Sequence, residues 1–110
     1  MQTEKLNLNA IWTEAHAAAV AATAATVNAN PDVWYPCGFA WVRIKPARGA
    51  FVNFLKEIDA GYTSEEGGYV VYNPSGHPTQ WMDAKYAGAR AFADVLRKHG
   101  IQAIAESRMD

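Results

Sequence analysis

The stretch Cys37-Gly38-Phe39-Ala40-Trp41-Val42-Arg43-Ile44 decides the fold of this chain. Its alternation is typical of a β-strand, in which successive side chains point to opposite faces of a sheet. One face carries Ala40, Val42 and Ile44, and the other carries Phe39, Trp41 and Arg43. Strands usually turn their rings toward the core. Here the small aliphatic side suits the core instead, so the stretch predicts an aliphatic, core-directed face and an opposite face whose composition suits binding.

The residues after this strand predict a split βαβ arrangement. The expected elements are a helix over residues 46–60, short strands over residues 62–64 and 69–73, a helix over residues 80–99 and a strand from residue 101 to 106. Apolar residues recur every three or four positions in both helices, Pro46 suits the first turn of one, and Gly100 suits the end of the other. The order predicts an α+β, ferredoxin-like fold, with two helices on one face of a small antiparallel sheet.

An alanine-rich helix is expected ahead of this unit, over residues 9–27 with Asn9 as its N-cap. Alanine favours helix but buries little area, so such a helix needs a flat surface to pack on. The sequence leaves open whether it covers the ring-bearing sheet face, leaves that face open, or crosses to a neighbour in a homodimer. We divide the chain into an N-terminal helix and loop, residues 1–36, and an α+β domain, residues 37–110, within a single folding unit.

The composition limits the classes of function. Ten basic and eleven acidic residues among 110 give a net charge of −1, so no global field drives binding to nucleic acid or membranes. Cys37 is the only cysteine, which excludes an internal disulfide and fits a reducing compartment. No stretch approaches the ~20 apolar residues of a membrane span, and no secretion signal is evident. We expect a cytoplasmic protein without membrane contact.

Rings and basic residues cluster around the first strand. Between Val33 and Lys56 every charged residue is basic, and an acidic stretch follows. Trp, Tyr and Arg are enriched at binding hot spots, although rings also fill cores. The expected partner-binding residues are Trp34, Tyr35, Phe39, Trp41, Arg43, Lys45 and Arg48.

Residues 37–44 resemble the RNP1 octapeptide of RNA-recognition motifs, whose pattern is basic-Gly-aromatic-small-aromatic-Val-any-aromatic. Residues 38–42 match, whereas Cys37 replaces the basic residue and Ile44 the last aromatic one. RNP1 also lies on the third strand of its fold, and here only a helix and a loop come first. The resemblance implies that Phe39 and Trp41 stack on bases, with Arg43 near phosphate.

Four stretches carry a second resemblance: His16-Ala17-Ala18, residues 37–49, residues 87–93 and residues 107–110. Through them the whole chain is similar to small uncharacterised accessory proteins encoded by tailed bacteriophages. That resemblance implies an accessory gene product that binds and modulates a host protein in the host cytoplasm, and it brings no catalytic residues.

Two arrangements with chemistry remain as minor alternatives. Cys37 with His77 as base and Asp83 as orienting residue would make a small hydrolase, but no recognised signature surrounds them. His77, Lys85 and Arg90 could surround an anion near the start of the last helix, although Lys85 and Arg90 point to different sides of it. The histidines lack the spacing of metal ligands, so we expect no metal and no cofactor.

The sequence thus predicts a non-enzymatic protein that binds a partner through its aromatic and basic sheet face. The phage resemblance implies that this partner is a host protein. Single-stranded nucleic acid is the alternative ligand of the same face, and the small hydrolase is the least supported alternative.

Overall fold

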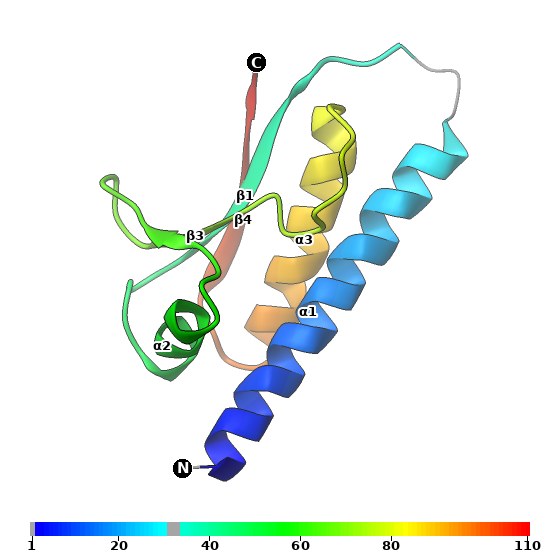
Figure 1. Ribbon diagram of the computed structural model, residues 1–110. Coiled ribbons are helices and arrows are strands. Elements are labelled where there is room, and N and C mark those ends of the chain that lie inside the picture. The colour runs from blue at the N-terminus through cyan, green and yellow to red at the C-terminus, as the bar shows by residue number, and fades with distance from the viewer. Residues whose placement is uncertain (1, 31–33) are drawn as a thin grey trace.

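The computed structural model describes residues 2–30 and 34–110. Its elements are α1 (Gln2–Ala29), β1 (Gly38–Ile44), α2 (Ala50–Glu57), β2 (Tyr62–Thr63), β3 (Tyr69–Tyr72), α3 (Met82–Lys98) and β4 (Ala103–Met109). Figure 1 shows α1 and α3 side by side, with α2 below β3 and the strands behind them. The predicted α+β fold with an N-terminal helix is confirmed.

The four strands form one antiparallel sheet in the order β2-β3-β1-β4. The crossover through α2 leads from β1 to the edge strand β2, and the crossover through α3 leads from β3 to the other edge, β4. This is the topology of the split βαβ unit that the element order predicts. The ring-bearing strand β1 therefore lies in the centre of the sheet, paired on both sides.

The core lies between the sheet and its helices. Ala40 and Val42 are fully buried and Ile44 is 3% exposed, as the alternation in β1 predicts. From the helices, Leu55 and Phe92 are fully buried against this face. Small and branched side chains in β1 leave room for these larger groups, so the aliphatic face is the core-directed one.

The alanine-rich helix packs in the helix layer, antiparallel to α3 (Figure 1). Ala15, Ala19 and Thr23 follow one another at four-residue spacing and are all fully buried. Thr23 Oγ1 donates a hydrogen bond of 2.8 Å to the carbonyl of Ala84 in α3. Gly88 allows this close approach, because a Cβ there would lie 3.1 Å from the Ala19 carbonyl and would clash with Thr23 Oγ1. α1 therefore stays within its own chain and leaves the opposite face of the sheet uncovered.

The largest differences from the expected helix boundaries are at the starts of α1 and α2, whereas the other helix ends differ by one to three residues. α1 begins at Gln2 rather than Asn9, because the residues between them include good helix formers. α2 begins at Ala50 rather than near Pro46, since Gly49 has a φ of 115°, which lies outside the helical region.

Among the described residues, no helix combines the length and the apolar character needed to cross a bilayer.

The last strand is also displaced. β4 begins at Ala103 and continues to Met109, three residues beyond its predicted end. The cause is its long partner, because β4 pairs with β1 all the way to Gly38. As a result Arg108 lies opposite Phe39 within the sheet, not at a free end.

Candidate binding face

The sheet face opposite the helices gathers alternate residues of all four strands. Strand register places these side chains on it: Phe39, Trp41, Arg43, Tyr62, Val70, Tyr72, Ile104, Glu106 and Arg108. We call this surface the aromatic sheet face. Most of these residues line a hollow of about 410 Å³, whose rim also includes Ser64 and Glu66 of the β2–β3 hairpin. The face therefore has both exposed rings and a concave centre.

Glu106 organises the centre of this face. Trp41 Nε1–H donates to Glu106 Oε1 at 2.6 Å, and Arg43 Nε–H donates to the same oxygen at 2.8 Å. The register explains this contact, since Glu106 on β4 is the cross-strand partner of Trp41. Arg43 also donates to the carbonyl of Gly67 in the hairpin loop, and it is only 8% exposed. Arg43 thus links the hairpin loop to Glu106, and its guanidinium bonds within the protein, whereas the RNP1 resemblance implies a contact with phosphate.

Phe39 marks the cationic end of the face. Its ring centroid lies 6.1 Å from that of Tyr72, 5.5 Å from Lys85 Nζ and 5.6 Å from the guanidinium carbon of Arg108. Burial raises the pKa of the Tyr72 hydroxyl above its ordinary value, with nearby Arg108 acting in the opposite direction. Tyr72 therefore remains a neutral hydrogen-bond donor at physiological pH, beside two cations.

Trp34 and Tyr35 lie outside this face. Tyr35 stacks on Trp81, with ring centroids 5.2 Å apart and an angle of 21° between the rings. This contact holds the loop before β1 against the start of α3. Trp34 is 88% exposed and offers its ring to solvent. The predicted aromatic loop is thus a separate surface feature.

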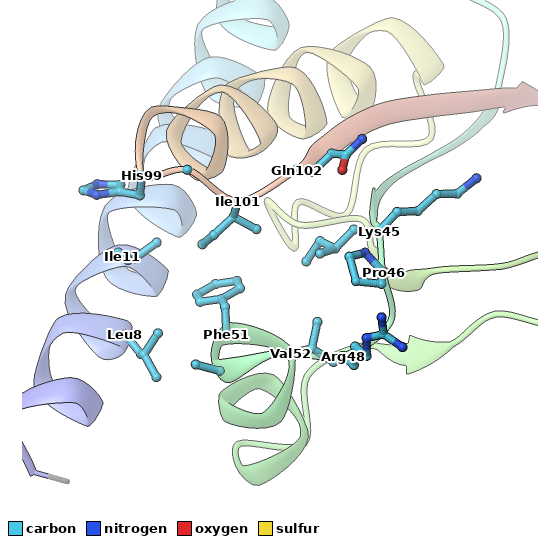
Figure 2. Close-up of a pocket in the computed structure, with 14 residues that line it drawn as sticks. Leu8, Ile11, Lys45, Pro46, Arg48, Phe51, Val52, His99, Ile101 and Gln102 are labelled. Atoms are coloured by element: carbon cyan, nitrogen blue, oxygen red, sulfur yellow. The ribbon is translucent and has the colours of Figure 1, made fainter.

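Lys45 and Arg48 lie outside the hollow of the aromatic sheet face, although the stem of Lys45 is beside that of Arg43 at Gly68. They line a second hollow, of about 430 Å³, bounded by α1, α2 and the segment before β4. Figure 2 shows the apolar side chains of Leu8, Ile11 and Phe51 gathered there, with Lys45 extending away from them. The predicted partner-binding residues therefore fall into three places, and of them Phe39, Trp41 and Arg43 line the hollow of the aromatic sheet face.

The residues of the hydrolase alternative have different neighbours. The Cys37 thiol is exposed and its Sγ lies 3.7 Å from Gln80 Oε1. His77 Nδ1 accepts a hydrogen bond of 3.0 Å from the backbone N–H of Thr79. Neither contact pairs the thiol with the imidazole. Within the residues that the structure describes, no group of three or more His, Cys, Asp or Glu side chains could hold a metal ion.

The three residues of the proposed anion site also turn to separate partners. Lys85 Nζ donates to the carbonyl of Gly38 at 3.0 Å, beside Phe39. The Arg90 guanidinium lies 5.9 Å from the ring centroid of Tyr86 on the same helix. Lys85 instead joins the cationic end of the aromatic sheet face, a contact that the helix pattern alone does not predict.

Six contributors to the face were not among the predicted site residues: Tyr62, Val70, Tyr72, Ile104, Glu106 and Arg108. Tyr72 and Tyr62 are about half exposed. Strand pairing places Tyr72 beside Trp41 of β1 and Tyr62 beside Val70 of β3. A signal for Arg108 was present, because the alternation of the last strand continues beyond Glu106.

No family model, curated protein or solved structure matches this chain.

Proposed function

We propose that the chain is a non-enzymatic accessory protein of a tailed bacteriophage that binds and modulates a host protein through the aromatic sheet face. The observation that supports this proposal is the fixed Trp41–Glu106–Arg43 group, which underlies a hollow edged by half-exposed tyrosines. The phage origin and the host partner come from the sequence resemblance, and the binding face comes from the fold.

A fixed tryptophan favours tight binding. Trp and Tyr are enriched at binding hot spots, where they bury large areas with few rotatable bonds. Trp41 is already held by Glu106 in the free protein, so a partner would not have to order it. Tyr62 and Tyr72 offer exposed rings at the same hollow. This combination suits the insertion of an apolar side chain of another protein into the hollow.

The charges of the face favour a protein over a polyanion. The Glu106 carboxylate offsets the charge of Arg43, and Glu66 lines the same hollow. A phosphate chain crossing the centre would therefore meet carboxylates as well as cations. The chain as a whole carries a net charge of −1, which gives no long-range attraction to nucleic acid.

Affinity capture tests the proposal. The tagged full-length chain would serve as bait in lysate of a bacterial host, at physiological salt, with and without nuclease. We expect one defined protein to be retained after nuclease treatment. Tyr62→Ala and Tyr72→Ala should each weaken its capture at least tenfold, since loss of a hot-spot ring costs about 2 kcal/mol or more.

Val20→Ala is the matched control, because Val20 is an equally exposed apolar residue on α1, remote from the face. It should capture the partner as the wild type does. Equal capture by all three variants would reject the aromatic sheet face as the binding site.

A second candidate ligand is single-stranded nucleic acid, which the Phe39 end of the face favours. There a base could stack on Phe39 or Tyr72 while Lys85 and Arg108 approach its phosphates. In that case binding to an oligonucleotide falls steeply with salt, and Phe39→Ala costs about 1–3 kcal/mol. Recovery of nucleic acid alone, lost on nuclease digestion, would support this ligand in place of a protein.

A further inference from the structure

The outer edge of β4 presents unpaired backbone groups. Lys45 N–H bonds to the Gln102 carbonyl at 3.2 Å, and Asp110 N–H bonds to the Cys37 carbonyl at 3.1 Å. In an antiparallel ladder the backbone groups of successive residues point alternately toward and away from the paired strand. These two bonds show that the even-numbered residues of β4 direct their N–H and C=O groups toward β1. The odd-numbered residues direct theirs outward. Within the described residues no strand pairs with this edge, because β4 ends the sheet.

The edge is open over a defined length. The carbonyl of Ala103 points outward but already accepts a hydrogen bond of 2.7 Å from Arg97 Nη1. With the part of the chain that the structure describes, the outward groups of Ala105, Ser107 and Met109 make no such contact. A seven-residue edge strand without a covering element is a template for pairing with another strand. The other edge strand, β2, has only two residues.

The charges of Glu106 and Arg108 favour a second copy of this strand as the occupant and restrict the register. In a two-fold pairing centred on Ser107, each Glu106 lies directly opposite Arg108 of the second copy, in the close, non-hydrogen-bonded positions. Centring the pair on Glu106 or on Arg108 would oppose like charges. Centring it on Ala105 would pair no opposite charges and would require the Ala103 carbonyl that Arg97 holds.

We propose that β4 pairs with β4 of a second copy of this chain, antiparallel and centred on Ser107. Ser107 then pairs with itself across the two-fold axis, and Ala105 pairs with Met109 of the second copy. The two sheets become one continuous sheet. Because the axis is perpendicular to it, both aromatic sheet faces lie on the same side. The pairing uses only the β4 edge, and it holds or fails independently of the partner proposed for the aromatic face.

Cysteine crosslinking tests the register in a Cys37→Ser background. Across a hydrogen-bonded antiparallel pair the two Cα atoms of residue 107 are about 5.5 Å apart, within disulfide range. The two copies of residue 109 would be about 14 Å apart, four residues out of register. We expect Ser107→Cys to form a covalent dimer under mild oxidation and Met109→Cys, although position 109 is also exposed, to remain monomeric. Preferential crosslinking of Met109→Cys, or crosslinking of neither, would overturn the proposal.

Light scattering after size exclusion gives the second measurement, with the full-length chain. The wild type and Ser107→Ala should have twice the mass of one chain. Ser107→Pro should have the mass of a single chain, because it removes an outward N–H and leaves the β1–β4 ladder intact. Arg108→Glu should also dissociate the dimer, with the dimer recovering as salt screens the repulsion. A wild type that stays monomeric at high micromolar concentration would refute the pairing.

Discussion

At the scale of single residues, Glu106 links two strands and a loop through one carboxylate oxygen. Trp41 and Arg43 both donate to Oε1, and Arg43 continues the chain of contacts to the Gly67 carbonyl. The Glu106 side chain is one-third exposed, whereas that of Arg43 is 9% exposed. The contribution of this group to the free energy of unfolding therefore comes mainly from the buried Arg43 guanidinium, which needs a hydrogen-bond acceptor.

Glu106→Ala should destabilise the protein by about 2 kcal/mol, because it leaves a buried cation and an indole N–H without their acceptor. Glu106→Gln keeps an oxygen acceptor and should cost less. Urea denaturation of both variants measures the difference in the free energy of unfolding. Glu65→Ala, an exposed change in the hairpin, is the control and should be near neutral. A midpoint for Glu106→Ala equal to that of the wild type would contradict the role of this group.

The alternation in β1 was enough to predict which residues face the core and which face outward. It could not predict that Arg43 is internally paired, because the paired carboxylate is 63 positions away in the sequence. Only the β1–β4 register brings Glu106 beside Trp41, and register depends on the whole ladder. A guanidinium on a ring-bearing strand therefore suggests a contact with a ligand. In the structure the Arg43 guanidinium bonds to Glu106 and to the hairpin loop of its own chain.

At the scale of elements, α1 and α3 approach closely because both carry small residues where they meet. Ala15 and Ala19 on α1 and Ala84 and Gly88 on α3 are buried there. The helical pattern predicted an alanine-rich helix that needs a flat surface. It did not identify that surface as another helix, since a stripe of alanines has no shape that favours a sheet over a helix.

Gly88→Ala should destabilise the protein, contrary to helix propensity. Propensity alone predicts a gain of up to about 1 kcal/mol. The added Cβ would clash with Thr23 Oγ1, so we expect a net loss of about 1–3 kcal/mol. In a double-mutant cycle Thr23→Ala should relieve part of that loss, so that the combined cost is less than the sum. Stabilisation by Gly88→Ala would show that the two helices separate easily.

The ion pairs of Glu14 add a pH-dependent link between α1 and the end of α3. Glu14 contacts Lys98 and, at 2.9 Å, His99 Nε2. The hydrogen bond from Lys98, and then that from His99, lowers the pKa of the Glu14 carboxyl below its usual value. A carboxyl whose pKa is lower in the folded than in the unfolded chain stabilises the fold above its unfolded pKa of about 4.3. That contribution is lost as the pH falls through the folded pKa.

Glu14→Gln should therefore lower the thermal midpoint at pH 7, and the difference from the wild type should shrink as the pH falls below about 4. Thermal unfolding followed by circular dichroism between pH 2 and pH 7 measures it. Because the pair is exposed, added salt should also reduce the difference. An equal difference at pH 7 and at the lowest pH would show that the carboxylate charge is not the cause.

At the scale of the whole molecule, the split βαβ unit is topologically complete without α1, yet its core is not. Leu8, Ile11 and Trp12 pack against the cluster of buried residues. The Trp12 ring meets the edge of the fully buried Phe92 ring, with centroids 5.7 Å apart. The boundary drawn at residue 36 from sequence thus separates two segments that share one core.

Residues 37–110 alone should consequently fail to unfold cooperatively. Burial of a large apolar side chain contributes about 1.5–3 kcal/mol, and a domain has only about 5–15 kcal/mol of net stability. Without α1, the small residues of α3 and the edge of Phe92 that Trp12 covers face solvent, so the fragment should bind a hydrophobic dye as a loosely packed state does. Adding a peptide of residues 2–30 should restore the cooperative transition and displace the dye. A fragment with a sharp transition near that of the intact chain would mean that α1 is an appendage to a core already complete.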